Sequence, residues 1–164
     1  IVDPSFSIRS MAKWRSKFNA IFSKTVALPS GGNIVINTAE ACQVIDVNSG
    51  SVKKSGSFSD MRRRLNREAA EMLVKHIKLR NLSGMIVVDF VHGMDEGERK
   101  DITSLIEEGL KDDMVITTVF GFTAMGLFEI ARQRRDLRFE EQYELAKRHH
   151  QEALKEKIKR ENSL

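Results

Sequence analysis

The sequence of 164 residues holds a single cysteine, Cys42, and this scarcity excludes two classes of protein. One thiol cannot form an internal disulfide framework, and it cannot supply the thiolates of a structural zinc cluster. We therefore expect no zinc site. Because Cys42 lies in an apolar stretch, we interpret it as a small buried side chain rather than as a reactive thiol.

Long apolar runs are also missing from the sequence. No run approaches the ~18–20 residues that a helix needs to cross a bilayer, and no secretory signal peptide is visible. We therefore expect a cytoplasmic protein without a membrane span. The chain begins with Ile1 rather than with methionine, which suggests a piece of a longer protein.

The composition is that of an ordinary globular chain. Hydrophobic residues make up 41% and charged residues 30% of the sequence, which suits one domain, or one domain plus an appendage. The pI of about 9.3 and the net charge of +4 permit a polyanionic partner such as a nucleic acid, without requiring one.

Two apolar stretches each carry one aspartate, Asp46 in VIDVNSG (residues 44–50) and Asp89 in MIVVDF (residues 85–90). Their β-branched residues are typical of strands buried on both faces. An uncompensated carboxylate in apolar surroundings is costly, so the pair suggests a shared metal ion. The alternative is that each aspartate caps a neighbouring loop, and that Asn48 only forms a turn.

The periodicity of the chain predicts the surrounding elements. Apolar residues at steps of three and four predict helices over residues 6–23, 60–80 and 95–111. The β-branched residues 114–120 predict a strand, whereas residues 121–134 fit a helix or an edge strand equally well. These predictions describe an α/β fold of the α+β kind, with a mixed sheet flanked by helices.

The order of the elements predicts how the two aspartates meet. The turn sequence LPSGG (residues 28–32) precedes a short strand, residues 34–36, which should form an antiparallel hairpin with the Asp46 strand. The sequence then runs strand, helix, strand to Asp89, which favours a parallel pair. Both carboxylates would then emerge at one edge of the sheet, where such sheets bind ligands.

The region between the two strands is basic and the region after Asp89 is acidic. We expect the acidic helix, residues 95–111, to face solvent and to be turned away from a polyanion. The basic residues could form a solvated face, but their place after the Asp46 strand suggests contacts with the phosphates of a polyanion: Lys53, Lys54, Arg62, Arg63, Arg64 and Arg67. Three aromatic residues could stack on bases, with Phe58 the best candidate, Trp14 better suited to the core, and Phe122 as the third.

Residues 136–164 form a charged helical tail with a thin apolar stripe, which either packs on the domain or pairs with another copy through residues 137–164. The stripe comprises Phe139, Tyr143, Ala146, His150, Leu154 and Ile158. The pair His149 and His150, with Glu152 nearby, has a spacing reminiscent of metal ligands. No further ligand is in sight, and a solvated face is the simpler interpretation.

Seven segments in register resemble the ribonuclease E/G family, specifically the deoxyribonuclease I-like subdomain of its catalytic region. They span about residues 20–135, and the following residues form the helical tail, so we predict a domain of residues 1–135 and a tail of residues 136–164. The segments are LPSGG (28–32), IVI (34–36), IDVNSG (45–50), N-x-EAA (66–70), KLRNLSG (78–84), IVVDF (86–90) and GLFEIARQR (126–134).

The resemblance implies an endoribonuclease that cleaves single-stranded RNA with Mg²⁺, or alternatively Mn²⁺, and leaves 5′-phosphate ends. It implies that Asp46 and Asp89 hold the metal and that Asn48 supports the site by hydrogen bonding. Mg²⁺ chemistry agrees, since this ion takes one or two carboxylates and keeps several waters. The alternative function is a non-catalytic RNA-binding protein that keeps the fold and the basic loop.

The sequence departs from the family pattern in three places. The family's RNA-binding and ribonuclease H-like domains would lie upstream of residue 1. The Cys-x-x-Cys pair that usually follows the RQR segment is replaced by the charged helix. His92 stands where relatives often have a further aspartate, and it would contact phosphate or metal, or else be an exposed loop imidazole.

Overall fold

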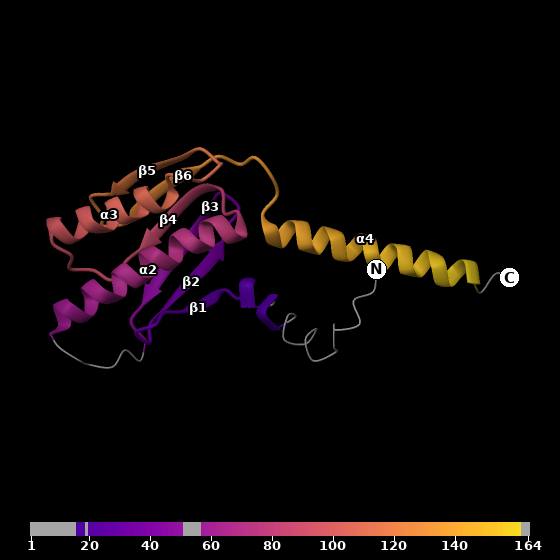
Figure 1. The fold of residues 1–164 in the computed structure, drawn as a ribbon, viewed down its shortest axis with the longest axis horizontal. Coiled ribbons are helices and arrows are strands. Elements are labelled where there is room, and N and C mark those ends of the chain that lie inside the picture. Colours follow the sequence, from indigo (N-terminus) through magenta and orange to yellow (C-terminus); the bar gives the residue numbers. More distant parts are fainter. Residues whose placement is uncertain (1–15, 19, 51–56, 162–164) are drawn as a thin grey trace.

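The computed structural model describes residues 16–18, 20–50 and 57–161 and has a mixed α/β architecture. Two helices pack against one six-stranded sheet, and a third helix, α4 (Phe139–Glu161), extends away from this body (Figure 1). The fold class predicted from the sequence is therefore confirmed. Of the expected first helix, residues 16–18 and 20–21 are helical, residues 22–23 are not, and residues 6–15 and 19, with Trp14, lie outside the described residues.

The sheet has the strand order β1-β2-β3-β4-β6-β5. A hairpin of β1 (Thr25–Ala27) and β2 (Asn33–Thr38) encloses the LPSGG turn, and β2 pairs antiparallel with β3 (Cys42–Asn48), as predicted. After α2, β4 (Gly84–Asp89) pairs parallel with β3, which confirms the expected strand–helix–strand unit.

The last two strands differ from the sequence predictions. β5 comprises Thr117–Phe122, later than the predicted 114–120, because its pairing with β6 begins at Thr117, opposite Arg132. The undecided segment 121–134 contains a strand, β6 (Phe128–Arg132), and it is interior rather than at the edge. β6 lies antiparallel between β4 and β5, so both of its sides are hydrogen-bonded.

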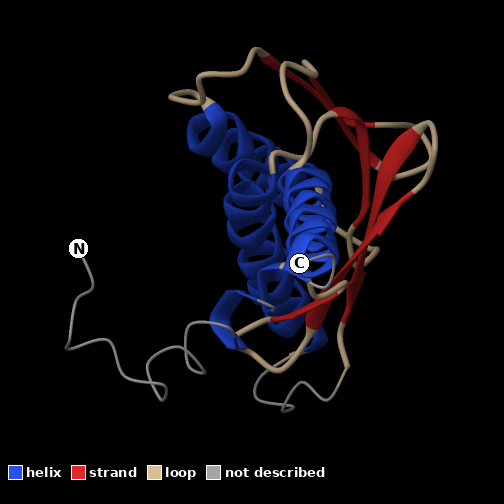
Figure 2. Ribbon diagram, turned by 90° about the vertical axis from the view of Figure 1, so that its right-hand side faces the viewer, coloured by secondary structure: helices blue, strands red, loops and turns tan. Residues whose placement is uncertain are grey.

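The helices cover one face of the sheet (Figure 2). α2 (Phe58–Arg80) buries Leu65, Ala69, Leu73 and Ile77, and α3 (Glu96–Leu110) buries Ile102, Ile106 and Leu110, which are the inward positions that the helical periodicity predicts. Ser57 begins α2 with a capping box to Asp60, and Asn81 ends it in the left-handed conformation.

The core lies between these helices and alternate residues of the strands. Ile45 in β3 and Ile86 and Val88 in β4 are completely buried, whereas their neighbours Val44 and Met85 are 40% and 56% exposed. The prediction that the aspartate strands are buried on both faces is therefore wrong. Among the described residues no helix covers the second face of the sheet. The β-branched residues on that face favour the strand conformation although they are not buried there.

Candidate active site at the ends of β3 and β4

Asp46 and Asp89 lie side by side on neighbouring parallel strands. They are register partners at the end of the β3–β4 ladder. Side chains alternate along a strand, and Ile45, Val47 and Val88 face the helices, so both aspartates point to the open face. Both are partly exposed. The parallel pairing thus brings together two carboxylates that are 43 positions apart in the sequence.

Asn48 joins the first aspartate directly. It lies two residues after Asp46 on the same face of β3, and its Nδ2 donates a hydrogen bond of 2.6 Å to Oδ2 of Asp46. One carboxylate oxygen of Asp46 is therefore held by the chain itself. This contact brings all three residues that the family resemblance assigns to the site into one group.

His92 contacts the second aspartate from the loop after β4. Its Nε2 lies 3.5 Å from Oδ1 of Asp89, and its imidazole remains 72% exposed. Gly126, in the turn between β5 and β6, faces the ring, since a Cβ at this glycine would lie 3.7 Å from Nδ1 of His92. The imidazole thus lies between the carboxylate of Asp89 and the β5–β6 turn.

The donor atoms of this site fit a hard divalent cation. Oδ1 of Asp89 is shielded from solvent and has no hydrogen-bond partner, although the side chain as a whole is 43% exposed. Mg²⁺ and Mn²⁺ bind carboxylate oxygens, and Mg²⁺ needs only one or two of them because it keeps several waters. Within the part of the chain that the structure describes, no three His, Cys, Asp or Glu side chains converge on a common metal position.

The turn before β2 packs against the Asn48 side of the site. A Cβ at Gly32 would lie 2.7 Å from the carbonyl oxygen of Asn48 and 2.5 Å from Cδ1 of Leu65, so only glycine fits there. The backbone N–H of Ser30 in the same turn donates to Oε2 of Glu68 at 2.8 Å. α2 therefore anchors the LPSGG turn against the end of β3.

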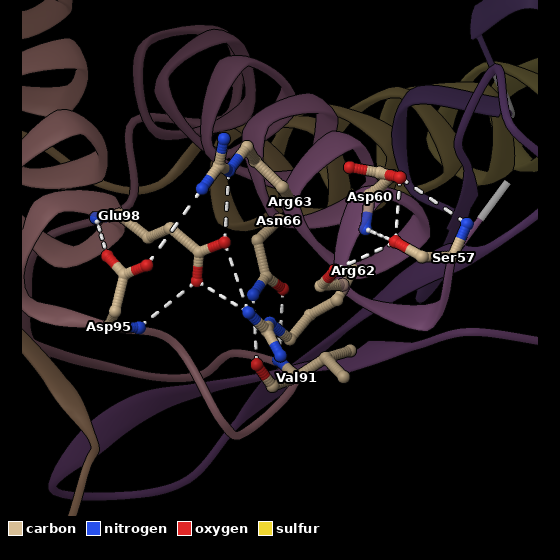
Figure 3. Close-up of polar contacts among 9 residues, drawn as sticks. Ser57, Asp60, Arg62, Arg63, Asn66, Val91, Asp95 and Glu98 are labelled. Atoms are coloured by element: carbon tan, nitrogen blue, oxygen red, sulfur yellow. Dashed lines mark hydrogen bonds and ion pairs between the residues drawn. The ribbon is translucent and has the colours of Figure 1, made fainter.

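An ion-pair network joins α2 to α3 (Figure 3). The guanidinium of Arg62 donates to both carboxylate oxygens of Glu98, at 3.0 and 2.7 Å, and Arg63 donates to the same carboxylate at 3.0 Å. The side chains of Arg62 and Glu98 are only 11% and 4% exposed. Burial alone would raise the pKa of Glu98, but the hydrogen bonds from the two arginines outweigh it and lower the pKa.

This network corrects two interpretations of the charge pattern. The acidic helix is not uniformly turned to solvent, because Glu98 faces inward to neutralise Arg62. Arg62 is not a free cation for phosphate, because its guanidinium is bound to Glu98. The signal in the sequence was weak: Glu98 is one helical turn before Ile102 and so belongs to the inward stripe of α3.

The other predicted RNA-contacting residues lie outside this network or at its rim. Arg63 and Arg67 are 64% and 65% exposed, with Arg67 paired to Glu71 at 3.3 Å, and Arg64 is exposed. Phe58 is 66% exposed at the start of α2, and its role in stacking stays a prediction. Lys53 and Lys54 lie outside the described residues.

Two further sequence interpretations concern aromatic and histidine side chains. Phe122 packs on Phe90 and Phe128, with ring centroids 5.9 and 4.9 Å apart, so it belongs to the partly buried aromatic cluster rather than to a stacking surface. His149 and His150 are exposed on α4. No helix among the described residues is long and apolar enough to span a membrane.

Comparison with known proteins agrees with this arrangement. Residues 3–135 match the model of the Ribonuclease E/G family. The chain is 35% identical over 111 residues to Ribonuclease G of Escherichia coli (strain K12), covering 68% of this chain and 23% of the relative. It is 32% identical over 119 residues to Ribonuclease E of the same strain, and 31% identical over 119 residues to Ribonuclease E of Haemophilus influenzae. These two alignments cover 73% of this chain and 11% and 13% of the relatives.

The fold and the site define an α/β protein with a carboxylate pair at the end of two parallel strands. The chain belongs to the Ribonuclease E/G family. It spans about a quarter of the length of the Ribonuclease G relatives that it matches.

Proposed function

We propose that this chain is the catalytic part of a Mg²⁺-dependent endoribonuclease, which hydrolyses single-stranded RNA to 5′-phosphate products in RNA processing or decay. The observation that supports this proposal is the pairing of Asp46 with Asp89 on the open face of the sheet, with Asn48 bound to Asp46. The names of the relatives, Ribonuclease G and Ribonuclease E, support the same class of activity.

In this proposal each residue has a separate task. Asp46 and Asp89 hold the ion, which when bound would activate a water and stabilise negative charge on the phosphate. Asn48 fixes one oxygen of Asp46, Oδ2, and leaves the other oxygen available to the ion. The exposed cations Arg64 and Arg67 bind the RNA backbone without reading its sequence, and Phe58 stacks on a base.

The test of the catalytic proposal is substitution of each aspartate by asparagine. We expect Asp46→Asn and Asp89→Asn to reduce Mg²⁺-dependent cleavage of an A/U-rich single-stranded RNA by at least about 100-fold, since loss of a ligand should exceed the effect of losing an outer-shell partner. The matched control is Asp112→Asn, an exposed aspartate in the loop after α3. The RNA affinity and the circular dichroism spectrum should not change.

One result would favour the alternative function. If the wild-type chain binds RNA but cleaves none in Mg²⁺ or Mn²⁺, the chain is a non-catalytic RNA-binding protein.

The basic surface can be tested with two neighbouring arginines. We expect Arg64→Ala to make the plot of log affinity against log salt concentration shallower by about 0.7, the value for one phosphate of a single strand. Arg62→Ala should leave that slope unchanged and instead lower the free energy of unfolding, because it removes the guanidinium that binds both oxygens of the buried Glu98 carboxylate. An unchanged slope in Arg64→Ala would remove this residue from the RNA surface.

We further propose that residues 137–164 pair with a second copy of the chain. The N-terminal end of α4 packs its aromatic residues Phe139 and Tyr143 on Phe22, while Leu145 and Ile158 remain 37% and 49% exposed. The first six residues of the helix, 139–144, hold three acidic and no basic residues, whereas residues 155–160 hold four basic and one acidic residue, so an antiparallel pair would bring opposite charges together. Removal of residues 145–164, which spares Phe139 and Tyr143, should lower the oligomeric state, measured by light scattering as the number of chains per particle.

A further inference from the structure

Asn66 is a polar side chain on the inward face of α2. It is only 1% exposed and lies between the buried residues Leu65 and Ala69. Its side-chain amide makes two hydrogen bonds with one residue: Nδ2 donates to the carbonyl of Val91 at 2.9 Å, and Oδ1 accepts from the N–H of Val91 at 3.0 Å. A helix side chain thus pairs with a backbone donor and acceptor in the way that a neighbouring strand would.

Val91 is the place where this pairing is needed. β4 ends at Asp89, so the hydrogen-bonded ladder to β3 stops at the residue that carries the carboxylate. Two residues later, the backbone of Val91 would be left without partners in a partly buried position, which is unfavourable for both groups. Asn66 supplies both partners and so continues the order of β4 past its end.

The loop that follows Val91 is held to the helices at further points (Figure 3). Gly93 has φ of +92° and lies against Arg62, since a Cβ there would be 3.2 Å from Nη1 of that guanidinium. The N–H of Asp95 donates to Glu98 at 3.1 Å. The segment between Asp89 and α3, which includes His92, therefore rests on contacts from α2 and α3.

We propose that Asn66 is a positioning residue for the metal-binding carboxylates, acting through the backbone of Val91 on Asp89 and on His92. This inference rests on the proposed function of the Asp46–Asp89 site. An apolar residue of similar size would fill the same space but would leave the Val91 N–H and carbonyl unpaired. The chemistry of the amide, rather than its volume, is what the site requires.

The test compares Asn66→Ala and Asn66→Asp with Leu73→Ala. Leu73 is 1% exposed on the same helix, about two turns further along, and no hydrogen bond joins it to the Val91 loop. Asn66→Ala and Leu73→Ala both lose buried contacts, so Leu73→Ala measures what general destabilisation does, whereas Asn66→Asp keeps the shape of the side chain and removes only its donor. The readouts are the affinity for Mn²⁺, by electron paramagnetic resonance, and the hydrogen-exchange rate of the Val91 amide.

We expect Asn66→Ala to weaken Mn²⁺ binding by about 10- to 100-fold, the range for residues that orient metal ligands. Asn66→Asp should have a smaller effect on the exchange rate, because a carboxylate still accepts from the Val91 N–H but cannot donate to its carbonyl. Leu73→Ala should retain the Mn²⁺ affinity of the wild type. Equal Mn²⁺ affinity in Asn66→Ala and the wild type would overturn the inference.

The exchange measurement separates this inference from the proposed function. If the wild type binds no Mn²⁺ and cleaves no RNA, the proposed function fails. The role of Asn66 in ordering the loop is then decided by exchange alone. Faster exchange at Val91 in the Asn66 variants, and not in Leu73→Ala, supports it, and equal acceleration in all three overturns it.

Discussion

The two faces of the sheet are built from the same strands but have different roles. On the helix-covered face Ile45, Ile86 and Val88 are completely buried. On the open face Val44 and Met85 are exposed, and Asp46 and Asp89 lie beside each other at the strand ends. The covered face holds the fold together by burying apolar area, whereas the open face contributes little burial.

This division explains how two carboxylates can lie in the centre of the sheet without a large cost in stability. A charged group is expensive only where it loses water without gaining a partner. Asp46 and Asp89 are only partly buried on the open face, and the shielded Oδ1 of Asp89 lies 3.5 Å from Nε2 of His92. Their presence therefore does not compete with the packing of Ile45 and Val88 one position earlier. Alternation along a strand thus places a polar site next to a core residue.

The largest expected effect concerns a buried ion pair on the covered face. Arg132 of β6 is 4% exposed and donates to Asp113 at 2.8 and 3.2 Å. Asp113→Asn removes the opposing charge, so the free energy of unfolding should fall by about 3–5 kcal/mol in urea denaturation. Asp112→Asn, at the exposed neighbouring position, should change it by less than about 0.5 kcal/mol. Similar values for both variants would contradict the contrast.

The next effect concerns pH and a histidine on the covered side of α2. Burial and the neighbouring Arg80 lower the pKa of His76 to about 4 from 6.5, and its Nδ1 accepts from Nε of Arg80 at 2.9 Å. Below pH 6.5 the unfolded chain binds a proton that the folded chain refuses, so stability falls as the pH drops from 6.5 to about 4.

We expect this loss to reach about 2–3 kcal/mol, measured as unfolding free energy against pH. His76→Gln keeps an acceptor for Arg80 but cannot be protonated, so its stability should depend less on pH over the same range. Parallel curves for the wild type and His76→Gln would show that His76 does not titrate as described.

The smallest effect is a direct comparison of the two faces by one substitution. Val88→Ala on the covered face should lower the free energy of unfolding by about 2 kcal/mol, because it removes two buried methyl groups. Val44→Ala on the open face should change it by less than about 0.5 kcal/mol. A cost at Val44 equal to that at Val88 would mean that another part of the protein covers this face in solution.

Much of the fold could be predicted from local patterns. The spacing of Leu65, Ala69, Leu73 and Ile77 determines which side of α2 is buried, and the strand–helix–strand order favours the parallel β3–β4 pair. The segment containing β6 could not be assigned in this way, because its alternation of Phe128, Ile130 and Arg132 places a charged residue at a core position. The partner that makes this acceptable, Asp113, is 19 residues away.

The sequence predicted three residues of the candidate site but not the residues that support them, and the metal-binding role of the two aspartates stays a prediction. Two signals in the sequence pointed to Asp46, Asn48 and Asp89. A lone carboxylate at the end of an apolar run is unfavourable without a partner, and the segments around these residues resemble family motifs. Asn66 and Glu98 were not recognised as supports, although each lies at a helical position where an apolar residue is expected. A polar residue at an inward position is the signal that could have found them.

The sequence by itself determined which residues prefer helix or strand and which two carboxylates could form a site, since these depend on neighbours within a few positions. Only the tertiary structure decided that the sheet has one covered face, that Arg62 binds Glu98 rather than solvent, and that Asn66 holds the backbone beyond Asp89. Each of these depends on segments that meet only after the chain has folded. The energy of a buried polar group is set by the partner that it meets there.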